Sequence, residues 1–264
     1  MYLQQKMRLA LLLSSCMFTV AFVGCEQKQP SSDEKTTAVS EQKISTSEVM
    51  PTIISDTPTK IHAETMSMTL PQKVSCESDE CTEYKVDTIE TNVDWINDYF
   101  VGRLQKDAPL AFQKSTHLPA STLAPSQINQ SSYSARFLGQ RGSLAIFVLD
   151  TTTYAAGAAH GMYHHEYIIF DLNTHKRITM VDLFSSDKQI AVYQAVFNAN
   201  QPWLEAHGIQ SGRLEPTDNF YYNSKGLVFV YPLYELAPYS EGMTELVLPY
   251  SAAKGLINSQ YLPK

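Results

Sequence analysis

The chain has 264 residues, with 27 acidic and 20 basic side chains and a formal net charge of −7 at pH 7. An acidic balance argues against binding to nucleic acid or to anionic lipid head groups, and it fits a basic partner. The length beyond the amino-terminal segments, about 200 residues, lies within the range of a single domain.

The first 24 residues have the pattern of a secretory signal. Lys6 and Arg8 precede an uncharged apolar run, residues 9–23, that is too short to predict a membrane span. The run ends in Phe-Val-Gly-Cys, which is similar to a lipobox. We therefore expect residues 1–24 to be a lipoprotein signal peptide and Cys25 to carry the lipid anchor. The alternative is a plain signal peptide followed by an incidental cysteine.

The segment after the lipidation site, residues 25–60, consists mainly of Ser, Thr, Gln, Glu, Lys and Pro and contains no aromatic residue. Such a composition predicts a disordered tether. We thus expect an exported, lipid-anchored protein with a folded domain at residues 61–264. Glu26, rather than an aspartate, follows Cys25, which favours the outer membrane, facing the periplasm.

Two of the four cysteines, Cys76 and Cys81, lie in the expected domain. Disulfides persist in exported proteins, so this pair predicts a small disulfide-closed loop. A metal site is the alternative, but the loop offers only carboxylates as further ligands. We expect no metal and no cofactor.

Hydrophobic patterning predicts an α+β fold. The expected helices are one that includes Trp95 and Leu104, with Thr91 or Asn92 as N-cap, and one at residues 187–207, with Ile190 on its buried face. The expected strands are a half-buried one around residues 66–70 and others around residues 84–88, 132–139, 144–154, 163–172, 178–181, 220–222, 227–231 and 246–250. This pattern predicts an antiparallel β-sheet packed with two main helices in a single domain.

Two motifs in this order resemble a known family. The first contains Gly157, His160 and Gly161, followed by Phe-Asp-Leu at residues 170–172, Lys176 and Asp-Leu-Phe at residues 182–184; the second contains Tyr234, Glu235, Ala237, Pro238, Tyr239, Gly242, Leu248 and Pro249. Together they resemble the extracellular domain of the RsiV anti-sigma factor, which is also appended to PdaC-type peptidoglycan deacetylases. Ala158 departs from the family by standing where a second glycine is usual. We do not expect an anti-sigma factor, because the sequence shows no cytoplasmic sigma-binding segment.

The resemblance implies a non-catalytic domain that binds a lysozyme-like muramidase or peptidoglycan. The candidate contact residues are Gly157, His160, Gly161, Tyr154, Tyr163, Tyr234 and Tyr239. The chain has 15 tyrosines, and tyrosine suits recognition because it offers rigid contact area with a polar tip. The other interpretation is that these tyrosines fill or border the core.

A catalytic site is not indicated. His164 and His165 are adjacent on an expected strand, so they point to opposite faces and only one of them can join His160 in a site. We expect His160 to hydrogen-bond backbone within its loop. The Ser-x-x-Lys segments at residues 185–188 and 251–254 are interpreted as helix starts. The remaining alternatives are a peptidoglycan-directed hydrolase, a deacetylase-accessory protein and a structural envelope lipoprotein.

Overall fold

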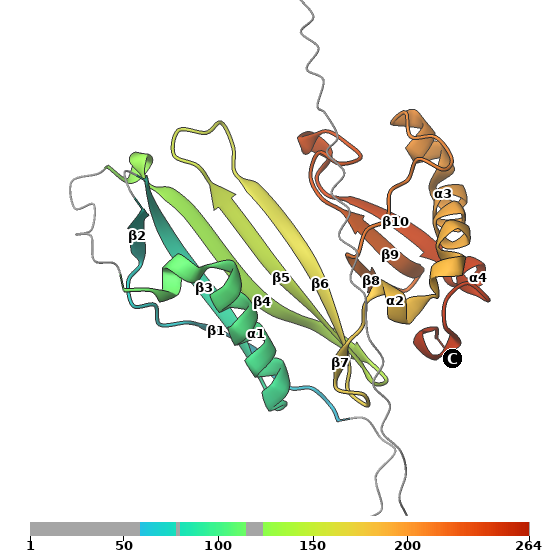
Figure 1. Ribbon diagram of the computed structural model, residues 1–264, viewed down its shortest axis with the longest axis horizontal. Helices are drawn as coiled ribbons and strands as arrows, with labels where there is room; N and C mark the ends of the chain where they lie inside the picture. Colours follow the sequence, from blue (N-terminus) through green and yellow to red (C-terminus); the bar gives the residue numbers. More distant parts are fainter. Residues whose placement is uncertain (1–58, 78–79, 115–123, 264) are drawn as a thin grey trace, which may run out of the picture. The chain divides into compact units, whose positions relative to one another are not determined.

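The computed structural model describes residues 59–77, 80–114 and 124–263 (Figure 1). The predicted signal peptide, Cys25 and all but the last two residues of the predicted tether lie outside these ranges. No helix of the described residues is long and apolar enough to cross a membrane.

The larger of two sheets has seven strands. They are β1 (Ala63–Ser67), β2 (Val74–Glu77), β3 (Glu80–Thr91), β4 (Asn129–Arg141), β5 (Leu144–Tyr154), β6 (Met162–Asp171) and β7 (Lys176–Arg177). Their order is β1-β3-β4-β5-β6-β7, and β2 also pairs with β3. The predicted disulfide joins Cys76 to Cys81, which are cross-strand partners on β2 and β3.

The α+β prediction is confirmed, but the sheet is not antiparallel throughout. Strands β3 and β4 run parallel, whereas the other paired strands of this sheet run antiparallel. A parallel pair needs a long crossover connection. Helix α1 (Asp94–Asp107) lies in the connection between these two strands.

Helix α1 covers one face of the larger sheet (Figure 1). It buries Ile96, Phe100 and Leu104 in a core that also contains Phe147 and Phe170 from the sheet. These three helical residues recur at the spacing of one helix face, which explains why the sequence predicted this element.

The predicted cap of α1 is wrong, because the N-cap is Val93. Thr91 instead hydrogen-bonds a side chain of the helix: its backbone N–H and its hydroxyl both donate to Oδ1 of Asn97. Asn92 likewise accepts a hydrogen bond from the backbone N–H of His62 through its side chain.

The smaller sheet has the order β10-β9-β8, formed by β8 (Phe220–Tyr222), β9 (Gly226–Tyr231) and β10 (Thr244–Pro249). Helix α3 (Gln189–Ala206) packs against it, and the shorter elements nearby are α2 (Met180–Leu183), η3 (Ser186–Lys188), η4 (Tyr239–Glu241), α4 (Tyr250–Ala253) and η5 (Ser259–Tyr261). The remaining short helices, η1 (Pro109–Phe112) and η2 (Pro125–Gln127), lie between α1 and β4. The core around the smaller sheet also contains Ile146 and Ile169 of the larger sheet, so one hydrophobic cluster joins the two sheets.

The structure corrects three predictions. The strand expected at residues 178–181 is not formed, because β7 ends at Arg177 and helix α2 begins at Met180. Ile190 is 85% exposed, whereas the buried face of α3 consists of Val192, Tyr193, Val196, Phe197 and Leu204. The strand expected around residues 66–70 lies earlier in the chain, at β1, which is exposed along its whole length. Met68 and Leu70 follow β1 and are half-buried against the α1 core, as expected, whereas Met66 is exposed. Helix α3 is also interrupted at Asn200, shortly before Pro202, whose ring cannot fit the preceding helical turn.

Candidate functional site

The two sequence motifs meet in space. His160 lies between β5 and β6, and its ring stacks on Tyr239, with ring centroids 4.1 Å apart. The hydroxyl of Tyr234 lies 3.2 Å from Nε2 of His160, and the ring of Tyr163 lies 6.3 Å from that of Tyr239. We call these four residues, His160, Tyr163, Tyr234 and Tyr239, the aromatic cluster.

The loop at residues 155–161 is held by contacts to its own backbone and to neighbouring strands. The hydroxyl of Tyr154, the last residue of β5, donates a hydrogen bond to the carbonyl of Ala158 and so holds the loop against the end of that strand. Gly157 has a φ of 78°, which glycine tolerates without strain. Ala158 is not among the described residues with positive φ, so the loop does not require the second glycine that the family usually has.

Glycine is required at position 161 because of close packing and not because of a positive φ. A Cβ atom at this position would lie 2.9 Å from the carbonyl oxygen of Thr153. The carbonyl of Gly161 is in turn 3.0 Å from Nδ1 of His160 and accepts a hydrogen bond of 2.9 Å from the hydroxyl of Tyr239. The expectation that His160 bonds backbone in its loop is therefore confirmed.

Tyr234 contributes an exposed ring from a strained backbone. Its φ is 68°, in the left-handed region, and the residue is 53% exposed. A non-glycine residue in this region carries a conformational cost that the surrounding structure must hold. Strained, exposed residues of this kind occur preferentially at functional sites.

A second group of polar residues adjoins the aromatic cluster on the larger sheet. His165 and Asp150 are cross-strand partners, and Nδ1 of His165 lies 2.6 Å from the Asp150 carboxylate. The same carboxylate accepts a 2.6 Å hydrogen bond from Nε of Arg136. Tyr163, two residues before His165, points to the same face of β6, and their rings are 5.3 Å apart.

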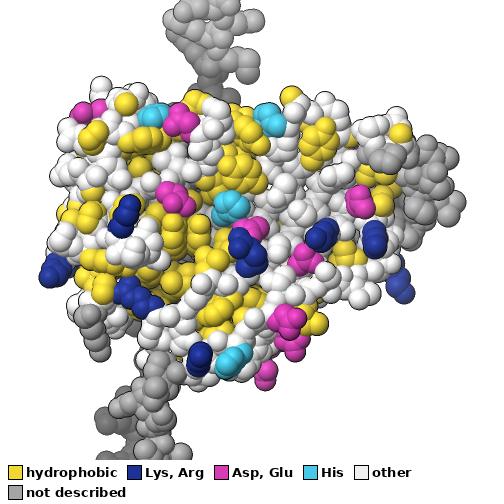
Figure 2. Space-filling model, turned by 180° about the vertical axis from the view of Figure 1, so that it is seen from behind, with side chains coloured by type: hydrophobic (Ala, Val, Ile, Leu, Met, Phe, Trp, Pro, Cys, Tyr) yellow, Lys and Arg dark blue, Asp and Glu magenta, His cyan; other side chains and the backbone are white. Residues whose placement is uncertain are grey.

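This face of the larger sheet is the one opposite α1. Figure 2 views the molecule from that side and shows histidine rings beside hydrophobic side chains, with acidic and basic side chains interspersed. The pairing of His165 with Asp150 had no signal in the sequence, because it depends on the register between β5 and β6. The prediction that His164 and His165 point to opposite faces agrees with their places on β6.

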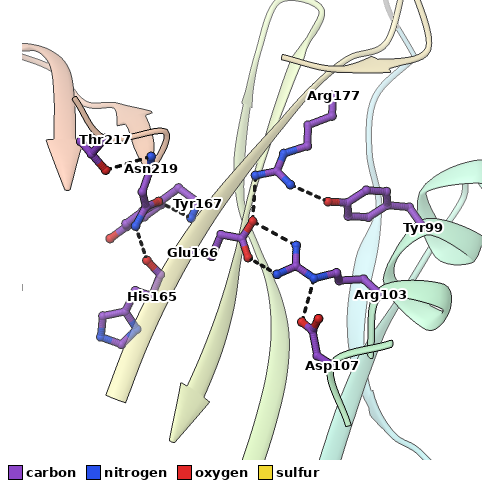
Figure 3. Close-up of polar contacts among 9 residues, drawn as sticks. All are labelled: Tyr99, Arg103, Asp107, His165, Glu166, Tyr167, Arg177, Thr217 and Asn219. Carbon is purple, nitrogen blue, oxygen red and sulfur yellow. Dashed lines mark hydrogen bonds and ion pairs between the residues drawn. The ribbon is translucent and has the colours of Figure 1, made fainter. Parts of the chain in front are cut away.

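The edge of β6 is held by a side chain. The amide of Asn219 donates to the carbonyl of His165 and accepts from the backbone N–H of Tyr167 (Figure 3). The backbone N–H of His165 donates to Sδ of Met243. These contacts tie the strand that carries Tyr163 to the segments before β8 and before β10.

On the α1 side of β6, Glu166 lies between two arginines (Figure 3). Its carboxylate accepts hydrogen bonds from Arg103 at 3.1 and 2.7 Å and from Arg177 at 2.8 Å. Burial alone would raise the pKa of Glu166, but the two guanidinium groups outweigh it and lower that pKa. Burial also lowers the pKa of the adjacent His164. This cluster links α1 to the sheet.

Two of the carboxylates inside the motifs, Asp171 and Asp182, have structural roles. Asp171 accepts hydrogen bonds from the backbone N–H of Asn173 and the hydroxyl of Thr174. Asp182 forms a capping box with Thr179 at the start of α2. Burial and the nearby Glu215 raise the pKa of Glu235. Within the described residues, no group of three or more His, Cys, Asp or Glu side chains could hold a metal ion.

The chain is thus a mixed α+β protein whose loops gather an exposed aromatic cluster. Residues 181–251 match the family described as "Protein of unknown function (DUF3298)". This region contains Tyr234 and Tyr239 but not His160 or Tyr163. No curated protein matches the chain.

Two solved structures have a similar fold. One is a DUF3298 family protein from Pseudomonas aeruginosa PAO1, with a TM-score of 0.57 and 22% identity over 79% of this chain and 99% of that chain. The other is a member of the same family from Bacteroides fragilis NCTC 9343, with a TM-score of 0.57 and 15% identity over 76% of this chain and 95% of that chain. At these identities the likeness concerns the fold alone, and the narrower resemblance to the RsiV ectodomain stays a prediction.

Proposed function

We propose that the protein is an exported, lipid-anchored envelope protein whose folded domain binds a lysozyme-like muramidase or peptidoglycan without catalysing a reaction. The aromatic cluster is the proposed contact surface. The observation that carries this proposal is the meeting of the two family motifs, since His160 of the first contacts both Tyr234 and Tyr239 of the second.

The geometry of the cluster suits recognition. Tyr239 and His160 are fixed to the same backbone carbonyl, so little side-chain freedom is lost when a ligand binds. Tyr234 offers an exposed ring beside them. Rigid aromatic rings with polar tips are the typical anchors of protein interfaces, and they also provide flat apolar faces.

Charge bears on the choice of partner. The net charge of −7 favours encounter with a basic protein, and such an attraction weakens as salt rises. Peptidoglycan instead carries carboxylates on its peptide stems and would bind through ring stacking and hydrogen bonds, so its binding would not weaken as salt rises. The salt dependence of binding therefore distinguishes the two partners.

The test is a binding measurement on the full-length protein, with immobilised lysozyme in one arm and insoluble peptidoglycan in the other. We expect the double variant Tyr234→Ala with Tyr239→Ala to bind at least about tenfold more weakly. The matched control is Ile190→Ala, which removes an exposed apolar side chain outside the cluster. Unchanged binding by the double variant, or no binding of the wild-type protein to either partner, would refute the proposal.

The pair His165 and Asp150 supports one alternative, a peptidoglycan-directed hydrolase. A histidine held by a carboxylate through Nδ1 leaves Nε2 free to act as a general base. However, no Ser, Thr or Cys side chain of the described residues hydrogen-bonds His165, so a nucleophilic mechanism has no candidate partner. Release of soluble muropeptides from peptidoglycan, abolished in His165→Ala but retained in His62→Ala, would favour this alternative.

A further inference from the structure

An open hollow of about 620 Å³ lies at the end of β5 opposite the aromatic cluster. It is bordered by the turn between β4 and β5 and by the turn between β8 and β9. The side chains that give it a mostly apolar lining are Leu138, Ile146, Tyr221, Tyr222, Tyr250 and Pro263. Its volume lies in the range of sites for small molecules, about 300–1,000 Å³.

Arg141 is the cationic residue of this hollow, and its guanidinium is fixed by aromatic side chains. Its Nη1 donates to the hydroxyl of Tyr250 at 2.9 Å. Its Cζ lies 5.5 Å from the ring centroid of Tyr222 and 5.2 Å from that of Tyr250. The hydroxyl of Tyr250 donates onward to the carbonyl of Asn223, which fixes the phenol as well. The charge is thus held in place before any ligand arrives.

Within the described residues, no carboxylate forms an ion pair with Arg141. The other four arginines of the described residues differ in their setting: Arg103, Arg136 and Arg177 pair with carboxylates, and Arg213 is exposed. Asp171 lines the adjoining hollow together with Arg141, but its oxygens accept from Asn173 and Thr174. A partly buried guanidinium without a counter-ion favours an external anion.

A second polar group at the same place lacks a partner. The hydroxyl of Tyr222 is buried and makes no hydrogen bond, and its residue is only 8% exposed. Burial raises the pKa of Tyr222, so the phenol stays a neutral donor. A buried group without a partner is uncommon in folded proteins and calls for an explanation.

We propose that this hollow binds an organic carboxylate that carries an apolar body. The carboxylate pairs with the guanidinium of Arg141, and the apolar body lies against Leu138 and the rings of Tyr221 and Tyr222. Leu138 is 45% exposed at the rim, so an occupant covers apolar surface that now contacts water. This site is separate from the aromatic cluster, and the proposal does not depend on the proposed function.

Two carboxylate probes separate the possible sources of such a ligand. Octanoate represents a fatty acid, and N-acetyl-leucine represents the carboxyl terminus of a peptide. Octylamine, acetate and inorganic phosphate are the comparison compounds, because they lack the charge or the apolar body. Binding to the full-length protein is measured by calorimetry and by the amide shifts of Arg141 and Tyr222 in NMR spectra.

We expect at least one of the two carboxylate probes to bind, and to bind at least about tenfold more weakly to Arg141→Gln. Arg213→Gln is the control, since it removes an exposed arginine outside the hollow. Leu138→Glu is a second variant that keeps Arg141 and places a negative charge at an exposed rim position, so a folding defect at Arg141 does not decide the result. It should weaken binding as well.

The proposal is overturned if neither carboxylate probe binds the wild-type protein. It is also overturned if acetate or phosphate binds as tightly as octanoate and N-acetyl-leucine, because the apolar lining then contributes nothing. Equal weakening by Arg213→Gln and Arg141→Gln would equally contradict it.

Discussion

His160 and Tyr239 stack on each other and share one acceptor, the carbonyl oxygen of Gly161. This arrangement fastens the loop after β5 to the segment between β9 and β10. The contact therefore links the larger sheet to the smaller one at the surface that we propose for binding.

The hydroxyl of Tyr239 provides the first test. Tyr239→Phe removes one hydrogen bond and should lower the free energy of unfolding by about 1 kcal/mol. The control is Tyr222→Phe, which removes a buried hydroxyl without a partner and should be neutral or stabilising. Urea denaturation of both variants measures the difference, and equal losses would contradict the assigned roles.

Tyr234 tests whether backbone strain is present at the proposed surface. Glycine tolerates the φ of 68° at this position, whereas alanine does not. Tyr234→Gly should therefore be more stable than Tyr234→Ala by about 1 kcal/mol, although both lose the ring. Thermal and urea denaturation compare the two, and a less stable glycine variant would argue against strain.

Asn219 tests how the edge of β6 is held. Asn219→Ala removes two hydrogen bonds and leaves the backbone N–H of Tyr167 without its acceptor, so we expect a loss of about 2 kcal/mol in unfolding free energy. Hydrogen exchange at the Tyr167 amide should become faster. The exposed Asn198→Ala serves as control and should change stability by less than about 0.5 kcal/mol.

The lowered pKa of Glu166 predicts how the stability of the fold responds to acid. Its pKa is lowered, because its contacts with Arg103 and Arg177 outweigh the effect of burial. The stabilisation is therefore complete above the unfolded-state pKa and is lost as pH falls through the lower folded-state pKa. Glu166→Gln should cost about 2 kcal/mol at neutral pH and should flatten the acid limb of the stability curve. The exposed Glu205→Gln should leave that limb unchanged.

The raised pKa of His207 predicts a pH dependence of stability with the opposite sign. Its Nδ1 bonds the carbonyl of Trp203, and its Nε2 lies 3.0 Å from the Glu241 carboxylate; both contacts raise the pKa of His207. The protonated ring donates to both partners, so its stabilisation is complete below the unfolded-state pKa and is lost as pH rises through the raised folded-state pKa. An NMR titration of the His207 ring measures this pKa directly.

The variant His207→Gln should remove this loss of stability with rising pH. The matched control is His62→Gln, at an exposed position directly before β1. Glu241 ends the short helix η4 that begins at Tyr239, so the pair of His207 and Glu241 adjoins the aromatic cluster in the fold. A stability curve identical to the wild type would show that the pair contributes nothing.

Most of the local elements could be predicted from the sequence, although the strands expected at residues 66–70 and 178–181 were misplaced. Residue spacing predicted α1 and α3, the main strands, and the opposite directions of His164 and His165, because periodicity depends on the backbone geometry of one segment. The pair Cys76 and Cys81 was predictable for the same reason, since a few residues separate its members.

Only the tertiary structure decided which distant residues meet. Strand register placed His165 opposite Asp150, and packing of the two sheets brought Tyr234 and Tyr239 to His160. The same packing set Arg141 against Tyr250 and turned Ile190 to solvent. These relationships depend on contacts between segments far apart in the chain, and residue spacing within one segment carries no information about them.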